Sequence, residues 1–300
     1  MRVNRLVLKI IKHYLNKSGD QIVANKPDFE GYTKFLNCAY EEGCQDCYRY
    51  DVVLAKPENR LGITLVDVHG GAYVYSTRRH NHTFMNFFLE RGFDIVLLDY
   101  PLGNGKIGPK EQFGAIYEQF QHFATHMKEY GVGEKLFLTG DSAGGHYALL
   151  LAEALTLPNV RENLGKPSLD NLNLQGILLS CPVYDYVNTA ATKGLTKYVR
   201  HQMFGPECDN LELVKAHCPR VNFKEFNLPI FVSSCRNDFI GFNSKLLDED
   251  SKALGKDLTY LYLDSDNRKV DHVHNLTKMD LPESLQVNQA MVDFMLAKVR

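Results

Sequence analysis

The sequence contains no tryptophan, almost no charge imbalance and no apolar run long enough to cross a membrane. Of its 300 residues, 34 are Lys or Arg and 36 are Asp or Glu, which gives a formal net charge of −2. A dedicated nucleic-acid-binding protein needs a basic surplus or a basic stripe for its phosphate contacts. A membrane span needs about 20 consecutive apolar residues. We therefore expect no nucleic-acid partner and no stable membrane insertion.

The seven cysteines lack the even number that a secreted disulfide framework requires. Cys181 and Cys235 lie in apolar runs, where a cysteine behaves as a small buried hydrophobic residue. We therefore predict reduced thiols and a cytoplasmic location. Cys44 and Cys47 have the spacing of half a zinc site, but only Cys38 lies near them in sequence and a closed site needs four ligands. A solvent-facing loop is the simpler interpretation, and we expect no metal.

Short β-rich runs alternate with helical patterns from about residue 50 onward. Several of the runs are continuously apolar, as in strands that are covered on both faces. Strands that alternate with helices predict a mostly parallel sheet, in a single α/β domain of residues 1–300. The predicted strands cover residues 50–55, 62–68, 93–98, 135–139, 174–180, 228–234 and 258–263, and the predicted helices cover residues 111–130, 143–155, 244–254 and 283–298.

Two regions do not fit this sheet, residues 1–45 and residues 184–227. Apolar residues between Val3 and Tyr14 share one helical face, which predicts a helix lying either on the protein's own body or on a membrane surface. An insertion as long as 184–227 is more often functional than a plain loop. We expect both regions to form a small cap over a pocket, with a structural excursion as the alternative.

The strongest motif is Gly140-Asp141-Ser142-Ala143-Gly144, between a predicted strand and a predicted helix. This is the G-x-S-x-G nucleophile elbow in the strand-turn-helix context that it requires. The two glycines allow strand and helix to approach closely, so the turn pushes the Ser142 hydroxyl out at the carboxyl end of the sheet. The N–H groups at the start of the helix also favour developing negative charge. We take Asp141 to be the variable residue of the motif.

A second motif, His69-Gly70-Gly71, directly follows the strand predicted at residues 62–68. Adjacent glycines leave their backbone N–H groups open to a ligand, as in the HGG-type loop that helps to form an oxyanion hole. The expected donors are the N–H groups of Gly70, Gly71 and Ala143. We interpret His69 as a structural residue that holds the loop.

With these two motifs, the chain from about residue 50 resembles the hormone-sensitive-lipase-like carboxylesterases. That resemblance implies the α/β-hydrolase fold, with a mostly parallel central sheet, helices on both faces and a small helical cap. The family order of Ser, then acid, then His selects Asp238 after the penultimate predicted strand, with Asp185 as the alternative acid. The histidine after the last strand is His272 by alignment, with His274 as the alternative.

The resemblance further implies a serine hydrolase that cleaves carboxylic esters of small to medium acyl groups, such as acetyl esters, without a cofactor. The partner is then a small-molecule ester; a homodimer is left open. Tyr73 and Tyr184 are the candidates for lining the substrate pocket, while His146, on the elbow helix, is expected to be structural. An arylformamidase-like amidase, an interfacial lipase and a catalytically silent binding protein remain alternatives.

One departure from the family concerns the loop after the strand at residues 93–98. Relatives commonly carry Asp-Tyr-Arg-Leu there, whereas this chain has Asp99-Tyr100-Pro101-Leu102. Pro101 therefore removes an arginine that usually locks the loop.

Overall fold

The structure, a computed structural model, describes residues 29–104, 106–185, 187 and 210–299. These residues contain one eight-stranded sheet in the order β1-β2-β4-β3-β5-β6-β7-β8. Strand β2 pairs antiparallel with β1 and β4, and all other pairs are parallel. All seven predicted strands are present. The bounds are β1 Thr33–Ala39, β2 Arg49–Leu54, β3 Ile63–Val68, β4 Asp94–Leu98, β5 Lys135–Asp141, β6 Asn173–Ser180, β7 Ile230–Cys235 and β8 Leu258–Leu263.

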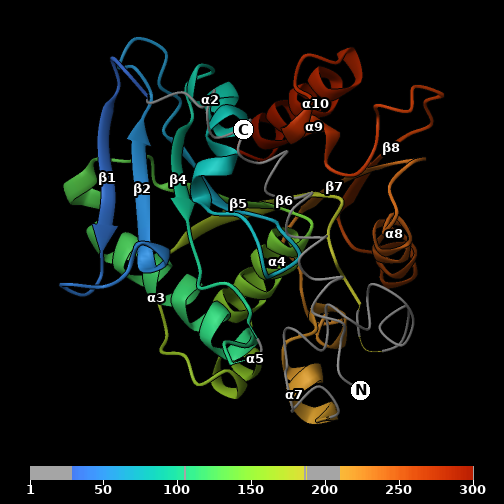
Figure 1. The fold of residues 1–300 in the computed structure, drawn as a ribbon, viewed down its shortest axis with the longest axis horizontal. Helices are drawn as coiled ribbons and strands as arrows, with labels where there is room; N and C mark the ends of the chain where they lie inside the picture. Colours follow the sequence, from blue (N-terminus) through green and yellow to red (C-terminus); the bar gives the residue numbers. More distant parts are fainter. Residues whose placement is uncertain (1–28, 105, 186, 188–209, 300) are drawn as a thin grey trace.

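Helices cover both faces of the sheet, with α3, α4 and α5 on one side and α2, α9 and α10 on the other (Figure 1). The four predicted helices are present as α3, α4, α8 and α10. The bounds are α2 His82–Leu89, α3 Pro109–Tyr130, α4 Ala143–Thr156, α5 Pro158–Asn163, α7 Leu211–Ala216, α8 Phe242–Leu254, α9 His274–Thr277 and α10 Pro282–Lys298, with short 3-10 turns η1 Asp46–Tyr48, η2 Arg78–Asn81 and η5 Pro219–Val221. No helix in these described ranges is both long and apolar enough to cross a membrane.

The core consists of two layers, because successive side chains of each central strand point to opposite faces of the sheet. On β3, Val66 and Val68 pack in the layer that contains α3 and α4. Ile63 and Leu65 of the same strand pack in the layer that contains α2 and α10. Burial on both faces explains why this strand is apolar almost throughout.

Part of the region predicted to lie outside the sheet is a strand. Residues 33–39, within the 1–45 cap prediction, form the edge strand β1. Its register shifts between Phe35 and Cys38, and Asn37 has a positive φ of 58°. A β-bulge of this kind interrupts the two-residue alternation on which a strand prediction depends. The helix predicted within residues 3–14 lies outside the described residues.

The 184–227 region is tied to α8 at both of its described ends. The backbone N–H groups of Tyr184 and Asp185 both donate to Asn243 Oδ1 at 3.0 Å. At the other end, Arg220 contacts Asp185 and Asp250, each at 2.8 Å. Residues 184 and 185 and Arg220 therefore contact the same helix; residues 186 and 188–209 of this prediction lie outside the described residues.

The cysteines in the described ranges are free thiols. Cys181, Cys218 and Cys235 are buried, and the other three are partly exposed. In this part of the chain, Cys44 and Cys47 belong to no group of three His, Cys, Asp or Glu side chains close enough to share an ion. Cys44 Sγ instead faces the carbonyl oxygen of Tyr48 at 3.6 Å.

A fully buried arginine connects the antiparallel edge of the sheet to the loop after β4. The Arg78 guanidinium donates to Asp51 Oδ2 on β2 and to Asp99 Oδ2 after β4, each at 3.0 Å. Asp46 and Asn37, the residue of the β1 bulge, also accept from it. A buried charge is tolerated only when it is paired and hydrogen-bonded in this way. Arg78 thus holds the loop after β4, which contains Pro101.

We expect Arg78→Ala to lower the free energy of unfolding by about 3–5 kcal/mol, because two carboxylates would stay buried without their partner. The matched control is Arg79→Ala. The Arg79 side chain is 42% exposed and its ion pair with Asp46 spans 3.9 Å, so its loss should cost less than about 1 kcal/mol. Urea unfolding of the two variants measures the difference, and equal losses would contradict this assignment.

A second buried ionisable side chain, that of Glu153, has no hydrogen-bond partner comparable to those of Arg78. Glu153 on α4 is fully buried, and neither carboxylate oxygen has a hydrogen-bond partner among the described residues. Burial therefore raises the pKa of Glu153 well above its ordinary value of 4.5. The folded protein holds this group as a neutral acid at a pH where the unfolded chain has already released the proton.

Since the folded pKa is raised, the stabilising contribution of the Glu153 proton is complete below about pH 4.5 and is lost as the pH rises toward the folded pKa. We expect Glu153→Gln, which does not titrate, to gain stability over the wild type by up to about 1.4 kcal/mol per pH unit above pH 4.5. Urea unfolding of both proteins between pH 5 and 8 measures the gap. A gap that does not change with pH would refute the buried neutral acid.

Candidate active site

Ser142 occupies a strained turn between β5 and α4. Its φ of 50° and ψ of −115° lie outside the regions that residues other than glycine ordinarily adopt. Two backbone bonds hold the turn: the Ser142 N–H donates to Ser180 O at 2.9 Å, and the Val183 N–H donates to Ser142 O at 3.1 Å. The side chain is thereby held clear of both strand and helix, as the elbow motif predicts.

The two glycines of the motif are needed because the backbone segments touch. A Cβ atom at Gly140 would overlap the carbonyl oxygen of Gly144. A Cβ atom at Gly144 would overlap the carbonyl oxygen of Val68, at the end of β3. Close contact between β5, α4 and β3 brings the serine next to the His69–Gly71 loop.

The structure places His272 and Asp238 in line with the serine. Ser142 Oγ lies 2.9 Å from His272 Nε2, and His272 Nδ1 lies 2.7 Å from Asp238 Oδ1. Asp238 follows β7, and His272 lies in the loop between β8 and α9. All three reach the same edge of the sheet because β5, β7 and β8 are parallel. The Asp238 side chain is fully buried, while the His272 side chain remains 17% exposed.

The alternative acid and base lie elsewhere. His274 is buried, its Nδ1 lies 2.8 Å from Ser284 Oγ, and burial lowers its pKa. Asp185 pairs with Arg220 at the base of the cap segment. Neither contacts Ser142 in the structure.

The predicted oxyanion donors differ in availability. Within the described ranges, the N–H groups of Gly71 and Ala143 have no acceptor, so both can donate to a ligand. The N–H of Gly70 instead donates to Asp141 Oδ1 at 2.8 Å. Gly70 therefore links the glycine loop to the elbow. The predicted oxyanion hole has two free N–H groups, those of Gly71 and Ala143, rather than the three that we expected.

Asp141, which we took for the variable residue of the elbow, links the elbow to the glycine loop. Besides Gly70, it accepts from Asn81 Nδ2 at 3.0 Å, and the same amide nitrogen donates to Asp67 Oδ2 at 2.9 Å. Burial, together with the neighbouring Asp141 charge, raises the pKa of Asp67 well above its ordinary value. No local sequence signal predicts this cluster, because Asp67, Asn81 and Asp141 come from three separate segments.

His69 holds the loop from the other side. Its ring stacks on Tyr100 with centroids 4.2 Å apart, and its nitrogens face Gly70 O at 2.7 Å and Asp99 Oδ1 at 3.0 Å. Asp99 is also the partner of Arg78. The buried Arg78–Asp99–His69 chain thus connects the edge of the sheet to the glycine loop.

The two tyrosines predicted to line a pocket are buried instead. The Tyr73 hydroxyl lies 3.0 Å from His146 Nδ1, and the Tyr184 hydroxyl donates to Asp250 Oδ2 at 3.0 Å. His146 Nε2 lies 2.6 Å from His217 O, and burial lowers the pKa of His146 to about 3. His146 is a neutral core residue, and the two tyrosine hydroxyls are already engaged with protein groups.

Backbone strain gathers around this edge of the sheet. Ala72, Ser142, Cys181 and Val273 all have φ values near 50°, and they follow β3, β5, β6 and β8 respectively. Non-glycine residues with positive φ persist only where surrounding contacts enforce them, and they cluster at functional sites. The Val273 N–H, next to His272, donates to Cys181 Sγ at 3.4 Å, so two of these strained turns support each other.

Cys181, Asp238 and His272 also place one donor atom each within 4.8 Å of one another. Two of these donors already make the contact between His272 Nδ1 and Asp238. A cation bound there would have to displace the hydrogen bond that orients the imidazole. We therefore assign this group to the serine site.

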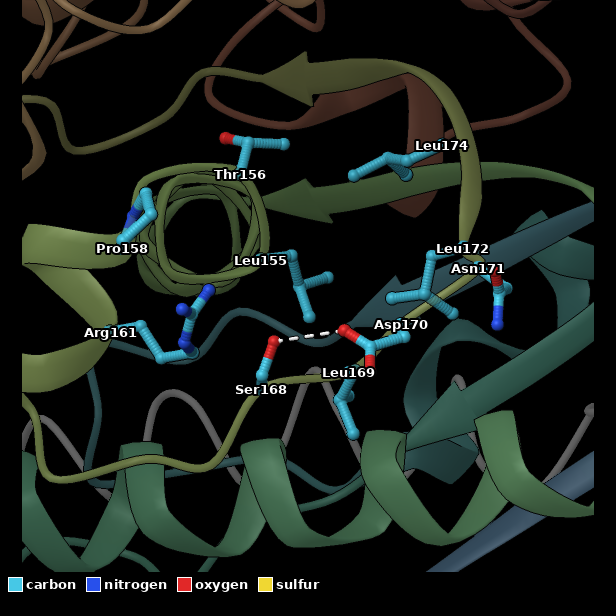
Figure 2. A pocket seen from close by; sticks show the side chains of 10 residues that line it. All are labelled: Leu155, Thr156, Pro158, Arg161, Ser168, Leu169, Asp170, Asn171, Leu172 and Leu174. Atoms are coloured by element: carbon cyan, nitrogen blue, oxygen red, sulfur yellow. Dashed lines mark hydrogen bonds between the residues drawn. The ribbon is translucent and has the colours of Figure 1, made fainter.

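Two cavities elsewhere are lined by none of Ser142, Asp238 and His272. Figure 2 shows the first, about 370 Å³, which lies among the end of α4, α5 and the loop before β6, with Arg161 and the hydrogen-bonded Ser168 and Asp170 in its wall. It opens at the amino end of β6, opposite the edge that carries Ser142. The second, about 670 Å³, lies between α3 and α7 and includes His217.

The fold is shared with several esterases. Esterase B from Lactobacillus rhamnosis, inhibited with a C4-C4 SN3 tributyrin phosphonate, superposes with a TM-score of 0.85 at 20% identity, over 98% of this chain and 96% of that chain. A bacterial heroin esterase has a TM-score of 0.71 at 15% identity, over 96% and 91% of the two chains. A hyperthermophilic esterase from the archeon Pyrobaculum calidifontis has a TM-score of 0.66 at 18% identity, over 97% and 94%. No curated protein sequence matches the chain.

These likenesses confirm the expected α/β-hydrolase fold. The BD-FAE family model matches residues 50–245, which is more than half of the chain and includes the glycine loop, the elbow and Asp238. The resemblance inferred from the motifs is confirmed: the chain belongs to the BD-FAE family, a hormone-sensitive-lipase-like family of α/β-hydrolases.

Proposed function

We propose that the protein is a serine hydrolase that cleaves carboxylic esters through an acyl-enzyme. The observation that carries this proposal is the line of contacts from Ser142 Oγ to His272 Nε2 at 2.9 Å and from His272 Nδ1 to Asp238 Oδ1 at 2.7 Å. A nucleophile, a base and a group that orients the base are the elements of nucleophilic acyl transfer. The esterases among the structural neighbours support the choice of ester over other acyl substrates.

In the first half-reaction, Ser142 Oγ attacks the ester carbonyl carbon while His272 Nε2 takes the hydroxyl proton. A carboxylate can only accept, so the proton on Nδ1 faces Asp238, and the imidazolium that forms is stabilised there. The carbonyl oxygen becomes an oxyanion, to which the N–H groups of Gly71 and Ala143 donate. When the C–O bond breaks, His272 gives its proton to the leaving alcohol.

In the second half-reaction, a water molecule replaces the alcohol. His272 takes a proton from this water as it attacks the acyl carbon, and returns it to Ser142 Oγ when the acyl bond breaks. The same two N–H groups stabilise the second oxyanion, so the cycle ends with a free carboxylic acid and the original serine. No metal or cofactor is required for either step.

The proposed substrates are small-molecule esters with small to medium acyl groups, such as acetyl esters. A structural neighbour inhibited with a tributyrin phosphonate supports a short acyl group. A carbohydrate esterase from gut microbiota is also among the neighbours and supports an ester substrate. Of the cap expected from residues 1–45 and 184–227, the described residues 184–185, 187 and 210–227 are the part on which the proposal of a cap rests. The anchoring of Asp185 and Arg220 to α8 supports this assignment.

We expect a fluorophosphonate probe to form one covalent adduct with the wild-type protein, at Ser142, and none with Ser142→Ala. Intact-mass spectrometry measures the adduct, and hydrolysis of p-nitrophenyl acetate measures activity. Ser142→Ala should lose about 10⁴-fold or more in kcat, because both half-reactions need the hydroxyl. No adduct together with equal hydrolysis by both proteins would instead favour a silent binding protein.

We expect His272→Ala to lower kcat on p-nitrophenyl acetate by about 10⁴-fold, since the serine loses its base. The matched control is His274→Ala, because His274 contacts Ser284 and not Ser142. Its kcat per folded molecule, with the folded fraction measured by circular dichroism, should stay within about tenfold of the wild type. The reverse ranking would refute the assigned base.

A further inference from the structure

An exposed aromatic ring lies directly against the imidazole of the proposed base. Phe239 follows Asp238 in sequence, and its ring centroid is 4.5 Å from that of His272, with the two planes inclined by 55°. Phe239 is 64% exposed, more than any other large apolar residue in the described part of the chain. A single exposed apolar residue is ordinary, but its place beside the reacting group gives this one chemical significance.

The turn that carries Asp238 fixes the position of Phe239. The Asp238 N–H donates to Cys235 O, the Gly241 N–H donates to Asp238 O, and the Ile240 N–H donates to Asp238 Oδ1, each at 3.1 Å. These bonds hold the carboxylate toward His272 and leave the next side chain at the solvent side of the same imidazole. The Phe239 ring therefore extends from a turn held by three hydrogen bonds.

The position of the Phe239 ring beside His272 relates it to the alcohol part of an ester. During acylation, His272 Nε2 gives its proton to the leaving oxygen, so the alcohol must depart next to the imidazole. An aromatic side chain in contact with that imidazole lies within reach of the first atoms of the alcohol. Covering the ring with an apolar group removes apolar surface from water, and two aromatic rings gain further from offset or edge-to-face contact.

We propose that Phe239 forms the subsite for the alcohol part of the ester and that it favours apolar, above all aromatic, alcohols. This proposal rests on the ester hydrolysis proposed above. In the step concerned, the bond from Ser142 Oγ to the acyl carbon forms and the bond from that carbon to the alcohol oxygen breaks. The serine proton leaves with the alcohol through His272, while the alcohol's apolar surface rests on the ring.

A purely protective role for the ring would have different consequences. If Phe239 only screened the His272–Asp238 hydrogen bond from water, its removal would slow every ester alike, in both half-reactions. A subsite for the alcohol acts only while the alcohol is present, which is before and during acylation. The kcat/KM value reports that stage, whereas hydrolysis of the acetyl-enzyme is common to all acetate esters.

The experiment compares three acetate esters, methyl acetate, phenyl acetate and 2-naphthyl acetate, with wild type and Phe239→Ala. We expect Phe239→Ala to lower kcat/KM for the two aryl acetates by about three- to tenfold and to leave methyl acetate within about twofold. Phenyl butyrate should fall by the same factor as phenyl acetate, because the acyl group lies on the other side of the scissile bond. Equal losses on methyl and aryl acetates, or no loss on any, would overturn the proposal.

The matched control is Phe242→Ala. Phe242 begins α8 and is 39% exposed, but no ring contact joins it to His272 among the described residues, so all three kcat/KM values should stay within about twofold of the wild type. A control that reproduces the aryl-selective loss would assign the subsite to Phe242 and overturn the role of Phe239. Failure of the proposed function is distinguishable, because the wild type would then neither hydrolyse any ester nor bind the fluorophosphonate probe.

Discussion

The positive-φ turn at Ser142 is the constraint on which the rest of the site depends. A serine does not hold such a conformation unless its surroundings enforce it, at a cost of about 1–3 kcal/mol. Here the enforcement comes from the sheet itself, since Ser180 at the end of β6 and Val183 just beyond it bond the serine backbone on both sides. This turn requires glycine at positions 140 and 144, because only residues without a Cβ atom allow β3, β5 and α4 to approach so closely. The buried packing of β3, β5, β6 and α4 therefore determines the orientation of the Ser142 side chain.

Buried charges position the glycine loop against this serine. Asp141 fastens the Gly70 N–H from within the elbow, while Arg78 and Asp99 act on the loop through His69. The buried carboxylates of Asp141 and Asp99 are tolerated because both accept hydrogen bonds. These contacts leave the backbone N–H groups of Gly71 and Ala143 free. The contact between Arg78 and Asp99 also holds the loop after β4, which contains Pro101.

Much of this architecture could be predicted from the sequence, and the failures share a cause. The seven central strands and four long helices follow from apolar runs and helical periodicity, and the elbow and glycine loop are contiguous motifs. Strand β1 was missed because the bulge at Asn37 breaks its alternation. Asp141 and Arg78 were missed because their partners are distant in sequence, and neither residue type signals a pairing by itself. Tyr73 and Tyr184 were misplaced because adjacency to a loop does not determine which way a side chain points.

The turn after β7 carries both the proposed acid, Asp238, and the ring proposed to contact the alcohol, Phe239. Its hydrogen bonds hold the Asp238 carboxylate against His272, and they also set Phe239 on the outer face of that imidazole. The acid cannot move without moving the ring, so the orientation of the base and the surface offered to the alcohol are determined together. In the proposed function, changes in this turn should therefore alter the choice of alcohol at some risk to the chemistry.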